Sequence, residues 1–445
     1  MRAHDSPQRH RRGGQGHRIR VAGRRLRRPG IRFFRPVKPS TNRNFPAPSP
    51  LFPSRQNSAG KVASSGHGQR SRRILARFLV SGGAGYVGSH VVLALLRRGD
   101  DVVVIDNLCQ GHRAAVPDEA EFIHLDLAER KDVAAVFASG RFDGVLHFAA
   151  LSLVGESMRE PMRYIAENVS NTAWLIDAAA RAGCLRFVLS STAALFGYPE
   201  RTPIDEYSRI DPVSAYGESK LMAERALDWA ERIHAVRSAS LRYFNAAGAD
   251  PDGSIGEDHD PETHLIPLAI KAALGLAPPL TVHGTDYLTP DGTCIRDYVH
   301  VADLADAHLR VLEYLRHGQS CRFNIGGGKG HSVREVMQAV ERIGGRPVPH
   351  RSGPRRPGDP PVLVASSERL RQETGWTPRH SGLDDIIRTA WAWHSGHPRG
   401  FGDKGRDCVR AAAPGSEKIL ELWGRDAAAT PTYNGTATLA QGGKG

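Results

Sequence analysis

The chain has 445 residues, of which 40% are apolar, and its formal net charge at pH 7 is +13. A chain of this length and apolar content can bury a full core. No stretch approaches the roughly 18 apolar residues of a membrane-spanning helix, and the N-terminus lacks the apolar centre of a signal peptide, so a membrane protein is excluded.

The positive charge is concentrated at the start of the chain. Residues 1–73 contain 17 Arg and 2 Lys but one acid, Asp5, so they carry +18 and the remainder carries −5. This Arg-, Pro-, Ser- and Gly-rich arm cannot bury enough apolar surface to offset chain entropy. Three interpretations stay open: a disordered tail, a targeting peptide, or sequence upstream of the true start. We favour the third, because an ordered pattern begins abruptly near Leu75. Binding of the arm to nucleic acid is an alternative with only composition behind it.

Apolar runs alternate with helical patterns from residue 77 onward, which is typical of an α/β protein with a doubly wound parallel sheet, the Rossmann fold. The runs that predict strands are residues 77–81, 101–105, 144–148, 186–190 and 239–243. Shorter elements follow, including helical patterns at residues 333–343 and 383–394. We therefore expect a basic arm (1–73), a Rossmann domain (74–245), a mainly substrate-binding C-terminal lobe (246–403) and a disordered tail (404–445).

A glycine-rich turn, GGAGYVG at residues 82–88, follows the first predicted strand and opens a helix. Glycines there let backbone amides approach a pyrophosphate at the helix N-terminus. The second strand ends in Asp106, 18 residues beyond Gly88. An acid at this place accepts hydrogen bonds from the adenosine ribose and would repel a 2′-phosphate. The pattern predicts NAD rather than NADP as cofactor; the alternatives are a tight turn and a solvated strand-end Asp.

Tyr216 and Lys220 lie four residues apart, on one face of a predicted helix. Tyrosine ordinarily ionises at about pH 10. A neighbouring ammonium and the positive nicotinamide ring would both lower that pKa, so we predict Tyr216 as the general base. Thr192, at a strand end, is expected to hydrogen-bond the reacting hydroxyl; alternatively it satisfies a backbone group.

These motifs, in this order, resemble the UDP-glucose 4-epimerases of the extended short-chain dehydrogenase/reductase family, and the resemblance covers most of residues 74–403. It extends through DNL at residues 106–108, HFAA at 147–150, VGES at 154–157, RYFN at 242–245 and GTCIRDYVH at 292–300. Related dehydratases carry an Asp-Glu pair after the strand-end Thr, whereas this chain has Ala193-Ala194. The absence of that acid pair favours epimerisation over elimination of water.

The resemblance implies two sets of binding residues. NAD is expected to contact Gly82, Gly85, Tyr86, Val87, Gly88, Asp106, Asn107, Asp126, Leu127, Phe148, Ala149, Ala150, Asn168, Lys220 and Phe244. The UDP-sugar is expected to contact Thr192, Tyr216, Asn245, His264, Leu265, Arg296, Arg356 and Asp359. Arginine suits a diphosphate because its planar fork donates paired hydrogen bonds. Each residue alone has a plainer interpretation, such as an ion pair for Arg296 or a solvated charge for Arg356.

The activity that the resemblance implies is an isomerase that interconverts UDP-glucose and UDP-galactose. Tyr216 would take the proton of the 4-hydroxyl while NAD oxidises C4, and reduction of the opposite face would invert it. Alternatives are a sugar reductase, a non-catalytic NAD-sensing protein with a nucleic-acid-binding arm, or an epimerase of another sugar such as UDP-N-acetylglucosamine. Ser152 and Leu363 keep the last open, because they depart from residues common in the family.

The family is commonly dimeric, so we expect a homodimer, with neither membrane nor nucleic acid as partner. No metal is expected, because the cysteines are scattered and lack Cys-x-x-Cys spacing. They are Cys109, Cys184, Cys294, Cys321 and Cys408. This usage favours a reducing cytoplasm as the location.

Overall fold

A computed structural model describes residues 76–356 and 359–402. The predictions for the basic arm and for the tail from residue 404 lie outside these residues. None of the helices within the described ranges combines the length and the apolar character that a membrane crossing demands.

The centre of the fold is a seven-stranded sheet in which every neighbouring pair of strands is parallel. Its spatial order is β10 (Cys321–Ile325), β6 (Arg237–Tyr243), β5 (Arg186–Thr192), β4 (Gly144–His147), β1 (Arg77–Ser81), β2 (Asp101–Asp106) and β3 (Glu121–His124). The order of the first six strands in sequence, with the reversal beside β1, is that of a dinucleotide-binding fold. The doubly wound parallel sheet expected from the sequence is confirmed.

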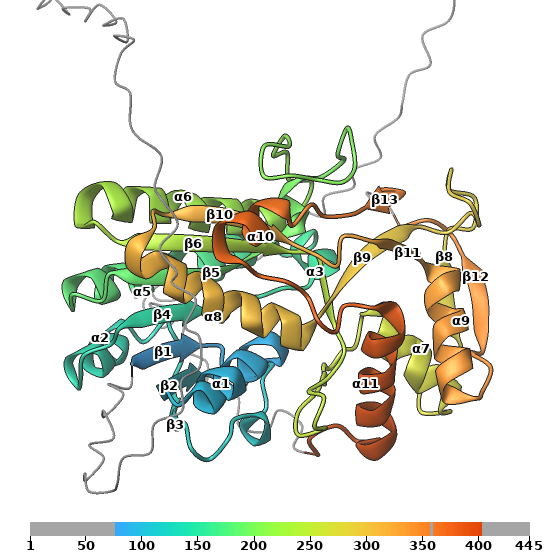
Figure 1. The fold of residues 1–445 in the computed structure, drawn as a ribbon, viewed down its shortest axis with the longest axis horizontal. Helices are drawn as coiled ribbons and strands as arrows, with labels where there is room; N and C mark the ends of the chain where they lie inside the picture. The colour runs from blue at the N-terminus through green and yellow to red at the C-terminus, as the bar shows by residue number, and fades with distance from the viewer. Residues whose placement is uncertain (1–75, 357–358, 403–445) are drawn as a thin grey trace, which may run out of the picture. The chain divides into compact units, whose positions relative to one another are not determined.

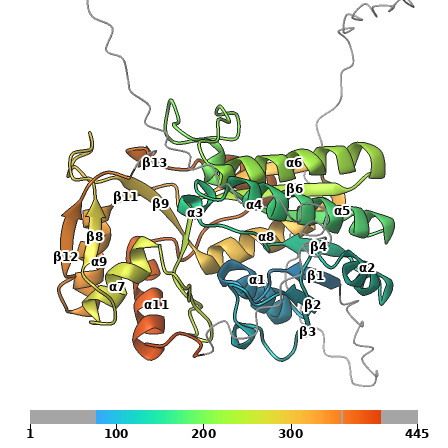
Figure 2. The same cartoon turned by 180° about the vertical axis from the view of Figure 1, so that it is seen from behind.

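Helices cover both faces of this sheet (Figures 1 and 2). On one face lie α1 (Tyr86–Arg98), α8 (Val301–His317) and α10 (Glu368–Thr374); on the other lie α2 (Arg130–Ala138), α5 (Asn171–Arg181) and α6 (Ala215–His234). Successive strand residues point to opposite faces, so Phe78 and Val80 pack in the first layer and Leu79 in the second. Burial on both faces explains why the strands read as continuous apolar runs.

The second face also carries a short helical bridge. It runs through α3 (Val154–Ser157), α4 (Pro161–Tyr164) and a π-helix (Ile165–Ser170) that continues into α5. The helices α3 and α4 both pack against α6, which carries Tyr216 and Lys220. The bridge therefore connects the end of β4 to the helix of the predicted catalytic residues.

A separate apolar core belongs to the elements drawn beyond the strand ends in Figure 1. Its helices are α7 (Leu265–Ala273), α9 (Val333–Gly344) and α11 (Leu383–Gly396), and its strands are β7 (Asn245–Ala247), β8 (Leu280–His283), β9 (Ile295–His300), β11 (Gly330–Ser332), β12 (His350–Gly353) and β13 (Val362–Leu363). This lobe is not one continuous segment, because α8 and β10 return to the large sheet. The boundary predicted at residue 245 stays a prediction.

Candidate active site

The turn between β1 and α1 packs so closely against neighbouring backbone that only glycine fits at two of its positions. Gly82 has φ of +75°, and a Cβ added there would lie 2.3 Å from the backbone nitrogen of Ala149. A Cβ on Gly88 would lie 2.1 Å from the carbonyl oxygen of Gly82. At Gly85, by contrast, a Cβ would meet only that oxygen, at 3.4 Å, so the surface in front of this residue is open.

The N-terminus of α1 is suited to an anion. Its cap, Gly85, is extended, makes no side-chain cap hydrogen bond, and is followed by no acid in the first turn. The first amides, on Tyr86, Val87 and Gly88, therefore face no carboxylate of their own helix, and the helix dipole favours a negative group. A cradle of this kind fits the pyrophosphate of a dinucleotide.

Two acids define the strand ends next to this turn. The buried carboxylate of Asp106 accepts from the backbone nitrogens of Ala84 (3.0 Å) and Leu108 (2.9 Å). Burial raises the pKa of Asp106, although these two bonds oppose the rise. Asn107 donates to Asp126 at 3.0 Å. The structure thus holds Asp106 at the end of β2, where the ribose of a dinucleotide is expected, and joins two of the predicted cofactor residues.

The other predicted cofactor residues lie around the same strand ends. The backbone nitrogens of Phe148 and Ala149 donate to the Ser81 carbonyl at 2.8 and 3.1 Å, and that of Phe244 donates to the Ile325 carbonyl at 3.1 Å. Leu127 is buried, whereas Ala150 is partly exposed. These contacts fix the backbone at the ends of β4, β6 and β10.

Asn168 has a supporting position in the structure. Its buried amide donates to the Leu151 carbonyl (3.0 Å) and to the Ser219 hydroxyl (3.0 Å), and accepts from the Leu151 nitrogen (2.8 Å). Since Ser219 precedes Lys220 on α6, Asn168 ties the loop after β4 to the helix of the predicted catalytic residues. Its predicted contact with NAD stays a prediction.

The three predicted catalytic residues come from β5 and α6. Tyr216 lies in the first turn of α6, whose cap, Ser214, accepts from the Gly217 nitrogen at 3.1 Å. Burial raises the pKa of Tyr216, while a hydrogen bond with Thr192 lowers it. The structure therefore brings Thr192 and Tyr216 together. Burial is the larger of the two effects, so the pKa of Tyr216 in the chain alone lies above its ordinary value; the lowering expected with the nicotinamide ring bound stays a prediction.

Lys220 is buried one helical turn beyond Tyr216. Its Nζ donates to the Ser190 carbonyl at 2.9 Å, and burial lowers its pKa to about 8. The Ser190 hydroxyl in turn hydrogen-bonds the Tyr243 hydroxyl. The ammonium is thus held against the end of β5 rather than on the Tyr216 phenol.

The predicted substrate residues lie on the second lobe and its links to the sheet. Arg296 on β9 forms an ion pair with Asp359, and its Nη2 donates to the Pro360 carbonyl at 2.7 Å. Arg356 is exposed, and its carbonyl accepts from the Asp359 nitrogen at 3.3 Å. The structure therefore gathers Arg296, Arg356 and Asp359 in one place. Asn245 donates to the Asp297 carbonyl at 2.7 Å, beside Arg296.

Leu265 begins α7 and His264 is its N-cap residue; both are distant from Arg296 and Asp359 in sequence but lie on the same lobe. The backbone nitrogen and Nδ1 of His264 both face Glu262 Oε1, at 2.9 and 3.1 Å. Although burial opposes it, the carboxylate of Glu257 raises the pKa of His264 to about 10. This side chain is therefore engaged by acids that the sequence prediction did not include.

Another unpredicted group supports the catalytic strand. Glu224, on α6 one turn beyond Lys220, accepts from the Ser191 hydroxyl at 2.6 Å and from Arg242 at 2.6 and 2.9 Å. Glu224 and Arg242 are each 1% exposed. Although burial opposes ionisation, Arg242 holds the pKa of Glu224 below its ordinary value. An acid on the apolar face of a predicted helix is the sequence signal that indicates such a pair.

Comparison with known proteins agrees with this geometry. Residues 78–326 match the NAD dependent epimerase/dehydratase family. The UDP-glucose 4-epimerase of Lacticaseibacillus casei is 48% identical over 326 residues, which cover 73% of this chain and 98% of that enzyme. The fold is also similar to the UDP-glucose 4-epimerase from Brucella ovis in complex with NAD, with a TM-score of 0.69, 44% identity, and coverage of 71% of this chain and 97% of that one. A Bifidobacterium longum UDP-glucose 4-epimerase, in complex with NAD+ and UDP, has a TM-score of 0.70 and 33% identity and covers 73% and 100%.

Proposed function

The chain belongs to the NAD-dependent epimerase/dehydratase family, and on that premise we propose that it interconverts UDP-glucose and UDP-galactose by inverting C4 of the sugar. The observation that carries the proposal is the hydrogen bond between Thr192 and Tyr216, one helical turn before a buried Lys220. It occurs in a chain whose glycine turn fits a dinucleotide pyrophosphate.

Each of the three residues has a distinct part in the proposed reaction. Bound NAD supplies the reversible removal and return of the hydrogen at C4. Tyr216 accepts the proton of the 4-hydroxyl and later gives it back, which is general acid–base catalysis. The hydroxyl group of Thr192 orients the 4-hydroxyl of the sugar through a hydrogen bond. Lys220, fixed by the Ser190 carbonyl, contributes positive charge that stabilises the phenolate form of Tyr216.

Inversion requires that the oxidised sugar present its other face while UDP stays in place. Arg296 and Arg356 are the cations that we assign to the diphosphate, because guanidinium groups donate paired hydrogen bonds to phosphate oxygens. Asp359 holds Arg296 through their ion pair. Asn245 and the His264-Leu265 segment complete the proposed UDP site.

We also propose a homodimer. Large apolar side chains are exposed along α3 and α4: Val154 (47%), Met158 (61%) and Met162 (72%). Methionine is enriched at protein interfaces, so we place the proposed dimer contact on this bridge. Light scattering should give twice the chain mass, and Met162→Glu should shift the measured mass toward that of the single chain.

A cytoplasmic location, where UDP-sugars and NAD are both at hand, is a further proposal that cell fractionation tests.

UDP-N-acetylglucosamine is a second candidate substrate. Leu363 lies on β13 directly opposite Arg296 of β9. A side chain smaller than an aromatic ring at that place leaves room beside the proposed UDP site for an N-acetyl group. Parallel assays with UDP-galactose and UDP-N-acetylgalactosamine decide this point, and Leu363→Tyr should reduce turnover of the acetylated sugar more than that of UDP-galactose.

Replacement of the general base tests the assigned reaction. Tyr216→Phe should lower turnover of UDP-galactose by about 10²–10⁴-fold, the usual contribution of a positioned acid–base group, yet leave the amount of co-purified NAD unchanged. Tyr198→Phe is the matched control, because Tyr198 is 57% exposed. Full activity of Tyr216→Phe would refute the assignment.

A further inference from the structure

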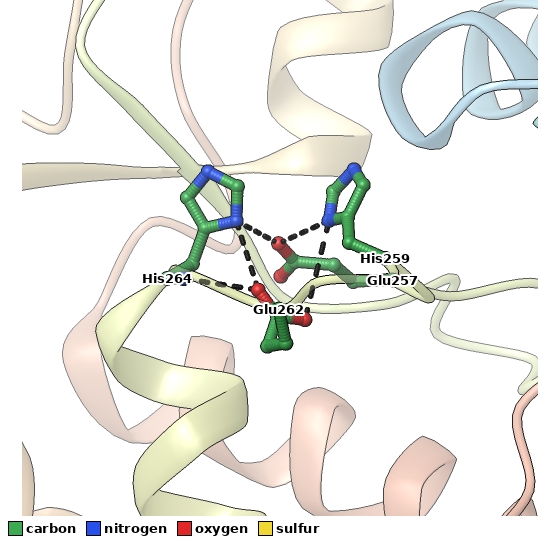
Figure 3. A group of neighbouring side chains, drawn as sticks. All are labelled: Glu257, His259, Glu262 and His264. Carbon is green, nitrogen blue, oxygen red and sulfur yellow. Dashed lines mark hydrogen bonds and ion pairs between the residues drawn. The ribbon is translucent and has the colours of Figure 1, made fainter. Parts of the chain in front are cut away.

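Four side chains converge in the segment that leads into α7: Glu257, His259, Glu262 and His264 (Figure 3). Each offers one nitrogen or oxygen atom, and these four atoms all lie within 4.8 Å of one another. His264 Nδ1 lies 2.9 Å from Glu257 Oε1 and 3.1 Å from Glu262 Oε1. His259 Nδ1 lies 3.2 Å from the same Glu257 oxygen and 4.0 Å from Glu262 Oε2.

Three of the converging atoms are buried without a hydrogen bond. They are Glu257 Oε1, His259 Nδ1 and Glu262 Oε2. Their N–O separations are short enough for ion pairs, but Glu257 Oε1 and His259 Nδ1 do not meet in hydrogen-bond geometry. Glu257 is only 3% exposed, so water does not readily satisfy it. A proton on a histidine or a metal cation at the centre of the cluster satisfies electronegative atoms that face one another in this way.

The backbone of Glu257 and the carboxylate of Glu262 are both held by hydrogen bonds. Trp393 Nε1 donates to the Glu257 carbonyl at 3.1 Å, and a Cβ on Gly256 would lie 2.3 Å from the Trp393 ring. Glu262 Oε1 accepts from the backbone nitrogens of Thr263 (2.8 Å) and His264 (2.9 Å). Ligands fixed in advance by a supporting shell are what a metal site needs.

We propose that Glu257, His259, Glu262 and His264 bind one divalent transition-metal ion of the zinc class. Zinc bonds of about 2.0–2.2 Å place the ligand atoms of a tetrahedral site about 3.3–3.6 Å apart. The three separations that involve Glu257 Oε1 or Glu262 Oε1, from 2.9 to 3.2 Å, lie just below that spacing, and the one from His259 Nδ1 to Glu262 Oε2, 4.0 Å, lies above it. Two imidazole nitrogens among the ligands favour zinc over magnesium or calcium, which prefer oxygen alone. The sequence analysis expected no metal because it considered the cysteine spacing alone, whereas the proposed site is built from histidine and glutamate.

The metal would join two regions of the proposed active site. The His259 ring lies 6.0 Å from that of Tyr86, the first residue of α1 in the cofactor turn. His264 immediately precedes α7 and the proposed UDP contact at Leu265. A metal held by all four ligands would leave no protein-free position for catalysis at tetrahedral geometry. Its role is therefore structural: it fixes the segment between the cofactor turn and the substrate lobe and takes no part in the reaction at C4.

Metal binding to the full-length chain tests the proposal. The protein is stripped with a chelator and titrated with Zn²⁺ against a chromophoric competitor; Co²⁺ then reports the ligand field by its visible absorption. We expect one Zn²⁺ per chain and a higher Tm with zinc than without. Removing a direct ligand in His259→Ala should weaken this binding by at least about 100-fold, since even outer-shell partners contribute 10–100-fold.

Two further variants protect the interpretation. Glu262→Gln keeps the side-chain volume and should weaken zinc binding as His259→Ala does. If one of these two variants fails to fold, the other still tests the proposal. His234→Ala removes an exposed histidine at the end of α6 and should bind zinc like the parent. The histidines of the basic arm are present in the parent and in every variant, so they do not cause a difference between them. If the parent binds no zinc, or if His259→Ala and Glu262→Gln bind it as tightly as His234→Ala, a proton on His264 holds the cluster and the metal site is wrong.

Discussion

Replacement of Glu224 by Gln removes a charge from the most buried ion pair described above. Its carboxylate accepts four hydrogen bonds, from Ser191, twice from Arg242, and from Arg322. A glutamine of equal volume turns one acceptor oxygen into a donor and leaves the Arg242 guanidinium, in a residue only 1% exposed, without its counter-charge. Removing one partner of a buried pair costs about 3–5 kcal/mol. We expect the free energy of unfolding to fall by that amount.

Urea unfolding of Glu224→Gln and of the parent at pH 7 measures the difference. Glu231→Gln is the control, because it makes the same substitution at an exposed position of the same helix and should change the free energy of unfolding by less than about 0.5 kcal/mol. A loss in Glu224→Gln no larger than in the control would refute the inference that this pair braces β5 and α6.

The pH dependence gives an independent check with a definite sign. Arg242 holds the pKa of Glu224 in the folded chain below its ordinary value. The stabilisation is therefore complete above the ordinary glutamate pKa of about 4.3 and is lost as the pH falls toward the lower folded value. The gap between parent and Glu224→Gln should shrink on acidification and stay constant between pH 6 and 8. A gap that grows at low pH would contradict the assignment.

Three other outcomes follow from the site. Gly88→Ala places a methyl group 2.1 Å from the Gly82 carbonyl oxygen and should lower the free energy of unfolding by about 1–3 kcal/mol. It should also remove most of the co-purified NAD, measured by release on denaturation. Gly155→Ala, where the new methyl group has nothing within 4 Å, should retain the NAD. Turnover should decline as the pH rises through about 8, where Lys220 loses its proton, and a flat profile of kcat/KM would contradict the role of the ammonium. Because the unfolded chain binds more protons than the folded one between that value and about 10.4, the contribution of Lys220 to the free energy of unfolding rises with pH in this range. Deprotonation of Lys220 therefore does not lower turnover by unfolding the chain. Arg296→Leu should raise KM for UDP-galactose more than it lowers kcat, and an unchanged KM would remove Arg296 from the UDP site.

Much of the fold could be predicted because its strands are buried on both faces. Four of the five predicted strands differ from the observed ones by only one or two residues at an end, and the fifth, β1, has the same bounds. Of the seven strands in the large sheet, β3 and β10 were not predicted. The β3 residues are partly exposed and polar at both ends, and β10 follows a long segment of the other lobe before it pairs with β6. A pairing so distant in sequence leaves no local pattern.

The candidate site was predictable where spacing alone positions residues. A turn of helix brings Tyr216 and Lys220 to one face, and a strand end places Asp106 beside the glycine turn. Burial could not be foreseen in the same way. In the chain alone it raises the pKa of Tyr216, and it encloses the Glu224–Arg242 ion pair, for which an acid on an apolar helix face was the one sequence signal.

The measurement that tests the central claim most directly is incubation of the purified chain with UDP-galactose in heavy water, without added NAD, followed by analysis of the product. We expect UDP-glucose to form with ordinary hydrogen at C4, because that hydrogen leaves for the bound cofactor and returns from it without exchange. No conversion, or deuterium at C4, would contradict the proposed reaction.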